Sequence, residues 1–502
     1  MGRINTNVQS LIAQRVLGQN QQSLSSSLQR LSTGLRINSG KDDPAGLIAS
    51  NNLGAEIASK NAAVANANRA DQVVNIAAGG LSEVSGLLTQ LQGLITATSS
   101  SAGISDAERS ANQLQIDSIL QTIDRISTST SFQGIKLLNG NFDFKTSGVA
   151  AGVADYKINA AKFQGSANVD VLVTGSAQQG GMFLSFGAAS IDTGTGSQFT
   201  IEVGGASGSR QLTFSSSTSL TNIAAAINSF TSITGVNASV SSTGIKLSAS
   251  DFGSANFVSL RVVDAGSVGS GGNIGVYDLV SNNTNASAGT RRNSFDQVTN
   301  TITNKGKDMQ ATINGVAAIT NGKTARINTD FLDVETTLTT GQSQTLGAVG
   351  SHAFSIIGGG ATFTLAGNVD ISGKVAIGIQ SVGTTALGNS VVGYLSELSS
   401  GQSSNVVKGS TETAQKIVGA AIEQISSLSG RLGAFQSNTV GATIRSLGVA
   451  VENATAAQSI IRDADFAAET AGLTRSQILV NASTNVLGLA NQAPQSVLQL
   501  LG

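Results

Sequence analysis

Apolar residues near the start of the chain repeat at the spacing of a helical seam. Leu17, Leu24, Leu28, Leu31 and Leu35 follow one another at steps of seven, four, three and four residues, which places them along one side of an α-helix. An isolated helix with such a stripe is only marginally stable in water. The pattern therefore predicts a helix that pairs with the C-terminal helix and with other copies of the chain.

The segment 31–46 ends this helix and begins another. Gly34 and Gly40 interrupt the seam, while Asp42 or Asp43, followed by Pro44, supplies an N-cap and a first-turn proline. An ordinary loop between two helices would also explain this capping. Beyond it, heptad spacing predicts a long helix from Ala45 to about Thr98.

A second helix and a strand follow. Asp106 can begin a helix whose apolar stripe extends to Ile126, and the short loop before it makes the two helices antiparallel neighbours. The segment 132–140 predicts a strand that ends in the Asn139-Gly140 hairpin turn.

The middle of the chain has a different pattern. Between about 142 and 400, short alternating runs rich in Gly, Ser, Thr and Val are separated by turn residues, which predicts a β-rich insertion between helical arms. A first module contains predicted strands and one capped helix in the order 198–203, 210–214, helix 219–228, 240 and 245–247. A second module is predicted from about 294 to 388.

The helical pattern returns from about Ser404, and a last helix is predicted from about Ala456 to Asn491. Asp463 and Asp465 lie near the start of that helix, where their negative charge suits the helix dipole. Both terminal arms of the chain are therefore helical.

Motifs at both ends of the chain occur in one order and at consistent places. They are the opening 1–7, the linker 31–46 and the C-terminal segments 461–470, 476–479 and 490–502. Together these motifs resemble bacterial flagellins, the subunits of the flagellar filament, over about the first 140 and the last 100 residues. The first β-rich module also resembles one that flagellins and hook-associated proteins repeat.

The resemblance implies an α+β multidomain fold. Long antiparallel coiled-coil-like helices from both termini would form the filament core, and β-rich outer domains would be inserted in the middle. It implies four parts: an inner-core domain with hinge (1–46 with 455–502), a helical rod with a β-hairpin (47–145 with 400–454), a β-rich outer domain (146–290) and a second β-rich domain (291–399).

The resemblance also assigns structural roles to residues. Inner-core packing would be carried by Leu24, Leu28, Leu31, Leu35, Leu487, Val497, Leu498, Leu500 and Leu501. Rod packing would be carried by Ile57, Val64, Val74, Leu81, Val84, Leu88, Ile422, Ile425, Leu432 and Phe435. The hinge would be Gly34, Gly40 and Pro44, where Pro44 replaces an alanine that is common in the family.

The implied partners follow from assembly and export. The resemblance implies a homopolymeric helical filament with heterologous, non-closing contacts, located outside the cell. Export would use the flagellar type III channel without a cleaved signal peptide, with a chaperone on residues 478–501, and the cap and hook-junction proteins would be further partners. Many flagellins are recognised by a Toll-like receptor through arginines on the first rod helix. Gln90, Gln92 and Gly93 occupy that stretch here, so weak recognition is expected.

Composition narrows the chemistry. The chain of 502 residues has 29 Lys and Arg against 30 Asp and Glu, for a net charge of −1, so no global field favours nucleic acid or an anionic membrane. It has no cysteine and one histidine, His352, which excludes disulfides and multi-histidine metal sites. No apolar window approaches the length of a membrane span. We therefore expect a structural protein that is not an enzyme, without catalytic residues, cofactor or metal.

Two other functions fit parts of the pattern. A hook-filament junction protein has similar termini but few copies, so abundance in sheared surface filaments would separate it from a flagellin. A secreted adhesin would use the β-rich insertion for binding, which an isolated fragment 146–399 would reveal.

Overall fold

The structure, a computed structural model, describes residues 6–100, 103–163, 165–194, 196–268, 273–279 and 288–501. Side chains are described throughout these ranges except at 288, 289 and 493–501. The described chain divides into two compact units. The first comprises the residues up to Gln72, the segment Thr364–Gly373 and the residues from Ala434 onward; the second comprises Val73–Phe363 and Lys374–Gly433.

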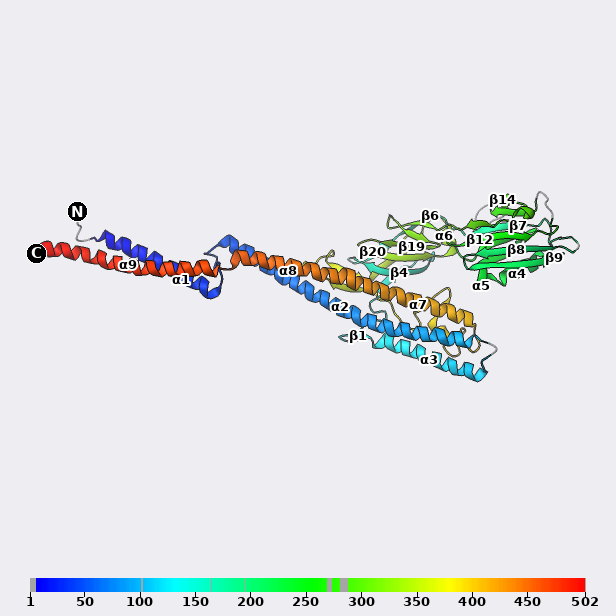
Figure 1. Cartoon of the computed structure of the whole chain (residues 1–502), viewed down its shortest axis with the longest axis horizontal. Coiled ribbons are helices and arrows are strands. Elements are labelled where there is room, and N and C mark those ends of the chain that lie inside the picture. The colour runs from blue at the N-terminus through cyan, green and yellow to red at the C-terminus, as the bar shows by residue number, and fades with distance from the viewer. Residues whose placement is uncertain are drawn as a thin grey trace. The chain divides into compact units, whose positions relative to one another are not determined.

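Long helices form both arms of the chain, and three short helices lie in the β-rich middle (Figure 1). The α-helices are α1 (Val8–Thr33), α2 (Pro44–Thr98), α3 (Asp106–Ser129), α4 (Leu220–Asn228), α5 (Thr231–Thr234), α6 (Thr340–Gln344), α7 (Thr411–Ala434), α8 (Gly441–Arg462) and α9 (Phe466–Leu501). A π-helical turn, η3 (Phe435–Val440), joins α7 to α8, and two 3₁₀ turns are η1 (Phe295–Gln297) and η2 (Leu395–Leu398). The predicted α+β class, with helical arms and a β-rich middle, is confirmed.

The C-terminal arm contains a break that the sequence pattern did not reveal. The prediction of one helix from Ala456 to Asn491 is wrong, because α8 ends at Arg462 and α9 begins at Phe466. Asp463 has an extended backbone, and the carboxylate of Asp465 accepts hydrogen bonds from the N–H groups of Ala467 and Ala468 at 2.9 and 3.1 Å. Aspartates that bond their own backbone in this way compete with helix continuation and cap a new helix.

The second unit contains a helical rod made of α2 from Val73 onward, α3 and α7. The helix α3 begins with a capping box, in which Ser105 and Glu108 each bond the backbone of the other. The irregular segment 379–409 is bonded along these helices: Gln113 of α3 bonds the backbone of Leu398 and Val406, and Gln424 of α7 bonds Gly388 through both its donor and its acceptor. These side chains satisfy backbone groups that no regular ladder satisfies.

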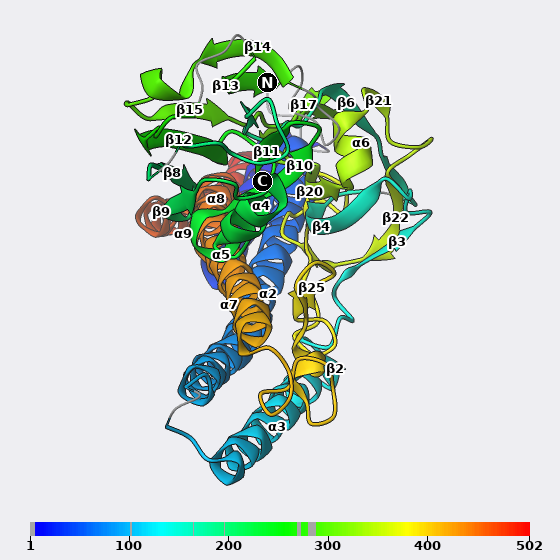
Figure 2. The same cartoon turned by 90° about the vertical axis from the view of Figure 1, so that its right-hand side faces the viewer.

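The strands form eight sheets among the described residues (Figure 2), and neighbouring strands are antiparallel across each of the three-, four- and five-stranded sheets. The three two-stranded sheets are β1 (Ser131–Phe132) with β2 (Ile135–Lys136), β23 (Ala361–Thr364) with β24 (Lys374–Ile377), and β25 (Gly388–Asn389) with β26 (Gly393–Tyr394). The five-stranded sheet has the order β10 (Val236–Ser241), β11 (Gly244–Ala249), β7 (Gly181–Ser185), β13 (Gly275–Leu279) and β14 (Ala288–Asn293), and the three-stranded sheet has the order β3 (Phe144–Ser147), β22 (Phe354–Gly359) and β5 (Ala167–Val169). The three four-stranded sheets have the orders β15 (Ile302–Lys305), β12 (Phe257–Asp264), β8 (Gln198–Gly205) and β9 (Gly208–Ser215); β17 (Val316–Ala317), β16 (Gln310–Ile313), β6 (Val171–Gly175) and β21 (Gly347–Ala348); and β18 (Ile319–Asn321), β19 (Thr324–Asn328), β20 (Leu332–Leu338) and β4 (Val153–Ala161).

The first β-rich body contains the predicted module. Strands β8 and β9 pair with Ile201 opposite Leu212, and Ser219 caps α4 by accepting the N–H of Asn222. The helix α4 packs on β10 (Figure 2), and Phe199, Phe295 and Met182 lie in one buried core. The strands and helix predicted for residues 198–247 are confirmed.

The second β-rich body is assembled from two separate parts of the sequence. Strand β4 pairs with β20, and β6 pairs with β16, so Ile158 and Val334 share one buried core. The first body is thus inserted between β6 and β16. This arrangement differs from the predicted division into 146–290 and 291–399, because pairing between distant strands leaves no mark on local alternation.

The small hairpin after α3 turns at a place other than the predicted one. Its strands β1 and β2 flank Gln133 and Gly134, which both have positive φ, at 49° and 82°. A two-residue turn with positive φ at both positions matches the twist of a hairpin. The Asn139-Gly140 pair lies beyond the strands, so the prediction of a hairpin turn there is wrong.

The buried stripe of the rod predicts a clear contrast between two leucines. Leu88 of α2 is fully buried, whereas Leu114 of α3 is 68% exposed. Leu88→Ala is expected to lower the free energy of unfolding by about 2 to 5 kcal/mol, through lost burial and a cavity. Leu114→Ala is expected to change it by no more than about 0.5 kcal/mol. Urea unfolding measures both, and equal losses would contradict the packing described here.

Candidate assembly surface

The two terminal helices pair with each other in the first unit. The amide of Asn7 donates to the carbonyl of Ala490 at 2.7 Å, and the hydroxyl of Ser10 donates to the side-chain oxygen of Asn491 at 2.7 Å. Further along, the amide of Asn20 donates to the hydroxyl of Ser483 at 2.7 Å. The α1–α9 pair is therefore aligned by polar contacts between residues more than 450 positions apart in sequence.

Pairing leaves several large apolar side chains of these helices uncovered. In α1, Val8, Leu11 and Ile12 are about half exposed, and in α9 Leu489 is 68% exposed. The side chains that are buried in the pair are small, such as those of Ala13 and Ala490. Large contiguous apolar patches on a protein surface mark sites of interaction with other molecules.

Part of this surface is a shallow apolar groove of about 500 Å³ along both helices. Ile12 and Val16 line it from α1, and Val486 and Leu489 line it from α9. None of these four was among the predicted inner-core residues. Val8, Ile12 and Val16 lie four residues apart, so helical periodicity alone could have indicated them.

Most of the predicted inner-core residues lie on the same helix pair, but Leu35 does not continue the helical seam, because α1 ends at Thr33 and Gly34 turns the chain into an extended segment. Leu24, Leu31, Leu35 and Leu487 are half-buried, and Leu28 is 49% exposed. The side chains of Val497, Leu498, Leu500 and Leu501 lie outside the described residues, although α9 extends through Leu501. Their packing in an assembly stays a prediction.

The segments that leave the helix pair are bonded to each other. Leu35 and Asp463 form an antiparallel bridge, in which the N–H of Arg36 donates to the carbonyl of Arg462 at 2.7 Å and the N–H of Ala464 donates to the carbonyl of Gly34 at 2.9 Å. The guanidinium of Arg36 also donates to the carbonyl of Ile461. The segments 34–36 and 461–464 are thus bonded to each other, and together they are called the paired link.

The predicted hinge residues differ in what the backbone requires of them. Gly34 has φ of +72° and closes α1, with its N–H donating to Arg30, so glycine is favoured there. Pro44 begins α2, where the Asp43 carboxylate accepts the N–H of Gly46 at 2.9 Å. Gly40 has no positive φ, and an added Cβ would make only an ordinary contact at 3.7 Å. The backbone therefore supports special roles for Gly34 and Pro44 but not for Gly40.

A glycine that the sequence pattern missed is Gly46. A Cβ there would lie 2.5 Å from the Asp43 carboxylate and 2.6 Å from the buried Ile37 side chain. Just before it, the N–H and hydroxyl of Ser39 and the N–H of Asn38 bond Asp42 and lower the pKa of its carboxyl. The turn before α2 is thus held by local hydrogen bonds and one close approach.

Most of the predicted rod residues are buried, whereas the predicted receptor residues lie at or near the surface. Val74, Leu81, Val84, Leu88, Ile425, Leu432 and Phe435 are buried, and Ile57, Val64 and Ile422 are half-buried. Gln90 and Gly93 are exposed and line a shallow depression with residues of α3, while Gln92 is half-buried. No charged side chain lines that depression.

Chemistry other than assembly finds little support in the described residues. His352 bonds Asp170 at 2.5 Å, and both side chains are largely exposed. Across the described parts of the chain, no three His, Asp or Glu side chains gather as a metal site would need. None of the described helices combines the length and hydrophobicity of a bilayer span.

Comparison with known proteins relates the chain to one family. Three family models match it: the bacterial flagellin N-terminal helical region over residues 4–143, the bacterial flagellin C-terminal helical region over 415–501, and the flagellin hook IN motif over 198–251. B-type flagellin of Pseudomonas aeruginosa is 31% identical, and flagellin D of Vibrio anguillarum is 27% identical, each over 99% of both chains.

Among solved structures, FliC from Burkholderia pseudomallei is 13% identical with a TM-score of 0.23, covering 73% of this chain and 99% of that chain. The sequence relationship, and not this structural likeness, identifies the family.

Two glycine substitutions in the N-terminal arm are expected to have opposite effects on the stability of the α1–α9 pair. Gly34→Ala is expected to destabilise the α1–α9 pair by about 1 to 2 kcal/mol, because alanine is strained at positive φ. Gly18 lies within α1 with open space around its Cβ position, so Gly18→Ala is expected to stabilise the same pair by about 0.5 to 1 kcal/mol. Amide hydrogen exchange within α1 measures both changes. If the amide protection of α1 changes in the same direction in both variants, the left-handed conformation of Gly34 is contradicted.

Proposed function

The chain belongs to the bacterial flagellins, structural subunits of the flagellar filament, and we propose that its copies assemble through the exposed apolar face of the α1–α9 pair. The observation that supports this proposal is the uncovered groove between Ile12, Val16, Val486 and Leu489. Each such side chain contributes about 1.5 to 3 kcal/mol when it is fully buried. The same face on every copy can meet a different face of the next copy, and such heterologous contacts build an open helical polymer.

The inner-core leucines extend this proposal along the helices. Leu24, Leu28, Leu31 and Leu487 lie on the same pair and are partly exposed, and Leu35 lies next to it in the paired link. Val497, Leu498, Leu500 and Leu501 would continue the apolar stripe to the end of α9. The paired link would transmit the position of this core to α2 and α8. The rod residues, most of which are already buried within one chain, would keep each subunit stiff.

Partners other than a second copy follow from the same surface. We propose that an export chaperone covers residues 478–501 before assembly, since Ile478 and Leu489 are more than half exposed. Passage through the flagellar type III channel without a cleaved signal peptide, and contact with the cap and hook-junction proteins, belong to the same proposal. The role is structural, not enzymatic, and needs no cofactor.

Seeded elongation tests the function itself. Purified chain, dissociated by heat and cooled with filament seeds, is expected to elongate long filaments that electron microscopy shows. A version truncated after Asn453 loses α9 and the paired link, and is expected to remain monomeric. Intact protein that does not elongate seeds would contradict assembly, and a truncated version that elongates them would contradict the role of α9.

A matched pair of substitutions tests the apolar face. Leu489 lies on the α1–α9 groove and Leu346 lies in the second β-rich body, and they are 68% and 63% exposed. Leu489→Asp is expected to raise the critical concentration for assembly by about tenfold or more, which corresponds to about 1.4 kcal/mol per contact. Leu346→Asp is expected to leave it nearly unchanged. Sedimentation of filaments measures both, and equal effects would argue against the groove.

Receptor recognition gives a separate prediction. Gln90, Gln92 and Gly93 place no charge on the rod surface where other flagellins carry arginines, so no charge-assisted hydrogen bonds can form there. We propose weak activation of the Toll-like receptor. A reporter-cell assay is expected to give little signal at low dose, and Gln90→Arg is expected to increase it. Strong signalling by the unmodified chain would contradict the proposal.

A further inference from the structure

The chain contains three asparagine–glycine pairs, and the fold places them in different surroundings. They are Asn139-Gly140, Asn314-Gly315 and Asn321-Gly322. In such a pair the backbone nitrogen of the glycine can attack the side-chain carbonyl carbon of the asparagine, because glycine has no side chain that hinders the approach. The attack closes a cyclic succinimide and releases ammonia. Whether a pair reacts in the folded chain depends on how the fold holds these two atoms.

Asn314 is held by its side chain. The side-chain oxygen of Asn314 accepts the N–H of Asp170 at 2.7 Å, and its side-chain amide donates to the carbonyl of Asn168 at 3.1 Å. These two bonds direct the side chain toward the segment 168–170. Its carbonyl carbon can approach the nitrogen of Gly315 only after they break, and the loss of two hydrogen bonds raises the barrier to ring closure.

The pair Asn321-Gly322 is protected at its attacking nitrogen. The N–H of Gly322 donates to the carboxylate of Asp308 at 2.7 Å, and Gly322 is buried. Ring closure needs removal of this proton, which would place a negative nitrogen beside the carboxylate, and a nearby like charge disfavours that state. A Cβ at Gly322 would lie 2.8 Å from the carbonyl oxygen of Phe252, so the backbone has little room to move.

Asn139 is exposed, and its side chain is arranged for the attack. Its side-chain oxygen accepts the N–H of Asn141 at 3.1 Å. This bond folds the side chain over the peptide unit between the two residues, so the carbonyl carbon of Asn139 turns toward the nitrogen of Gly140. The same N–H donates to the oxygen that gains negative charge during ring closure, and a donor in that place stabilises the charge. In the described chain the N–H of Gly140 is engaged by no acceptor.

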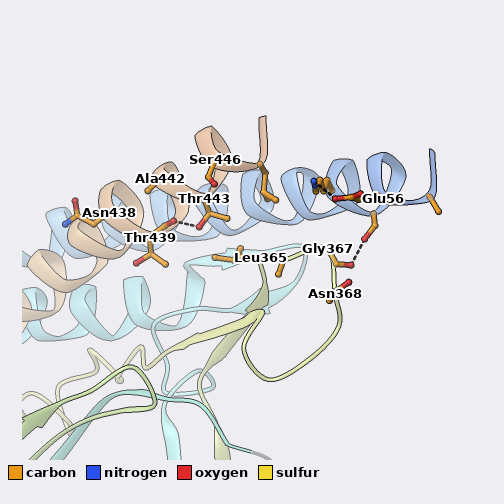
Figure 3. Close-up of a pocket in the computed structure, with 14 residues that line it drawn as sticks. Glu56, Leu365, Gly367, Asn368, Asn438, Thr439, Ala442, Thr443 and Ser446 are labelled. Atoms are coloured by element: carbon orange, nitrogen blue, oxygen red, sulfur yellow. Dashed lines mark hydrogen bonds and ion pairs between the residues drawn. The ribbon is translucent and has the colours of Figure 1, made fainter. Parts of the chain in front are cut away.

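Exposure alone does not make an asparagine reactive in this way. Asn368 and Asn438 are also exposed, and both line the groove of about 790 Å³ in Figure 3. The loop of Asn368 is ordered, since the hydroxyl of Ser59 donates to the carbonyl of Gly367. The residues that follow these asparagines are a valine and a threonine, whose branched side chains crowd the attacking nitrogen. Asn368 and Asn438 are therefore exposed controls within the same chain.

We propose that Asn139 deamidates spontaneously in the folded chain, and that the fold protects Asn314 and Asn321. The nitrogen of Gly140 gives its proton to solvent and forms a bond to the side-chain carbonyl carbon of Asn139, and the side-chain nitrogen takes up a proton and leaves as ammonia. Water then opens the succinimide at one of its two carbonyl carbons. One opening gives aspartate, and the other gives isoaspartate, in which the main chain passes through the former side chain.

The site lies next to an anchor between the segment after the hairpin and the rod. The carbonyl of Leu138 accepts the hydroxyl of Ser127 on α3 at 2.8 Å and the N–H of Val382 at 2.9 Å. Isoaspartate lengthens the main chain directly after this anchor. Both products also add a negative charge at neutral pH. The modification therefore changes the charge and the covalent geometry of a segment that is bonded to α3.

Peptide mapping tests the proposal. The purified chain is incubated in warm, mildly alkaline buffer and digested, and mass spectrometry with electron-transfer fragmentation distinguishes asparagine, aspartate and isoaspartate. Asn139 is expected to convert about tenfold or more faster than Asn314 and Asn321, which corresponds to about 1.4 kcal/mol in activation free energy. Asn368 and Asn438 are expected to stay unmodified. Equal rates at the three pairs, or faster conversion at Asn314 or Asn321, overturn the proposal.

Unfolding supplies the matched control. In concentrated guanidinium chloride the three pairs are expected to convert at similar rates, because the bonds that protect Asn314 and Gly322 are lost. A difference that persists in the unfolded chain would come from local sequence and would overturn protection by the fold. Asn139→Gln keeps the amide on a longer side chain and is expected to give no modified peptide at this position; modification there would overturn the assignment. Both measurements use the unassembled chain, so their outcome is independent of the proposed assembly.

Discussion

The large apolar side chains of the terminal helices are only partly covered within one chain, and this constraint distinguishes the α1–α9 pair from the other parts of the described chain. Two helices can cover only the stripe along their line of contact, and in the α1–α9 pair small residues such as Ala13 and Ala490 occupy that line. The larger side chains, including Leu11 and Leu489, stay in contact with water. Under the proposed function these side chains become buried when copies associate, and the hydrophobic effect favours that removal of apolar area from water.

Other parts of the chain bury their apolar side chains without help. The rod stripe of Leu81, Val84 and Leu88 is fully buried, and the two β-rich bodies have separate cores that contain Phe199 and Phe354. These parts have buried cores within one chain, whereas the terminal pair leaves large apolar side chains exposed. Under the proposed function, stability and association thus belong to different segments of one sequence.

Local sequence signals predicted the helices and strands that depend on periodicity and on capping residues. Heptad spacing predicted α2, the Asp43-Pro44 pair predicted its first turn, and alternation with Ser219 as a cap predicted β8, β9 and α4. The break at 463–465 was missed because Asp463 and Asp465 were interpreted as lying near the start of a helix that begins at Ala456. In the structure, Asp463 is extended and Asp465 bonds the first N–H groups of a new helix.

The features that join distant segments were not predictable in this way. The pairing of β4 with β20, the docking of Gly367 on Ser59 and the close approach at Gly46 depend on contacts that no local period encodes. For the proposed assembly surface, periodicity predicted that the terminal helices have apolar stripes. Which side chains stay uncovered depended on how α1 and α9 face each other.

The contact between Asn7 and Ala490 joins residues 483 positions apart, and the paired link joins Arg36 to Arg462. Neither the α1–α9 pair nor its joint can form until both ends of the chain are present together. A chain that lacks either end could form neither this pair nor the proposed assembly surface. Under the proposed function, the topology of the subunit therefore makes assembly depend on the presence of both ends of the polypeptide.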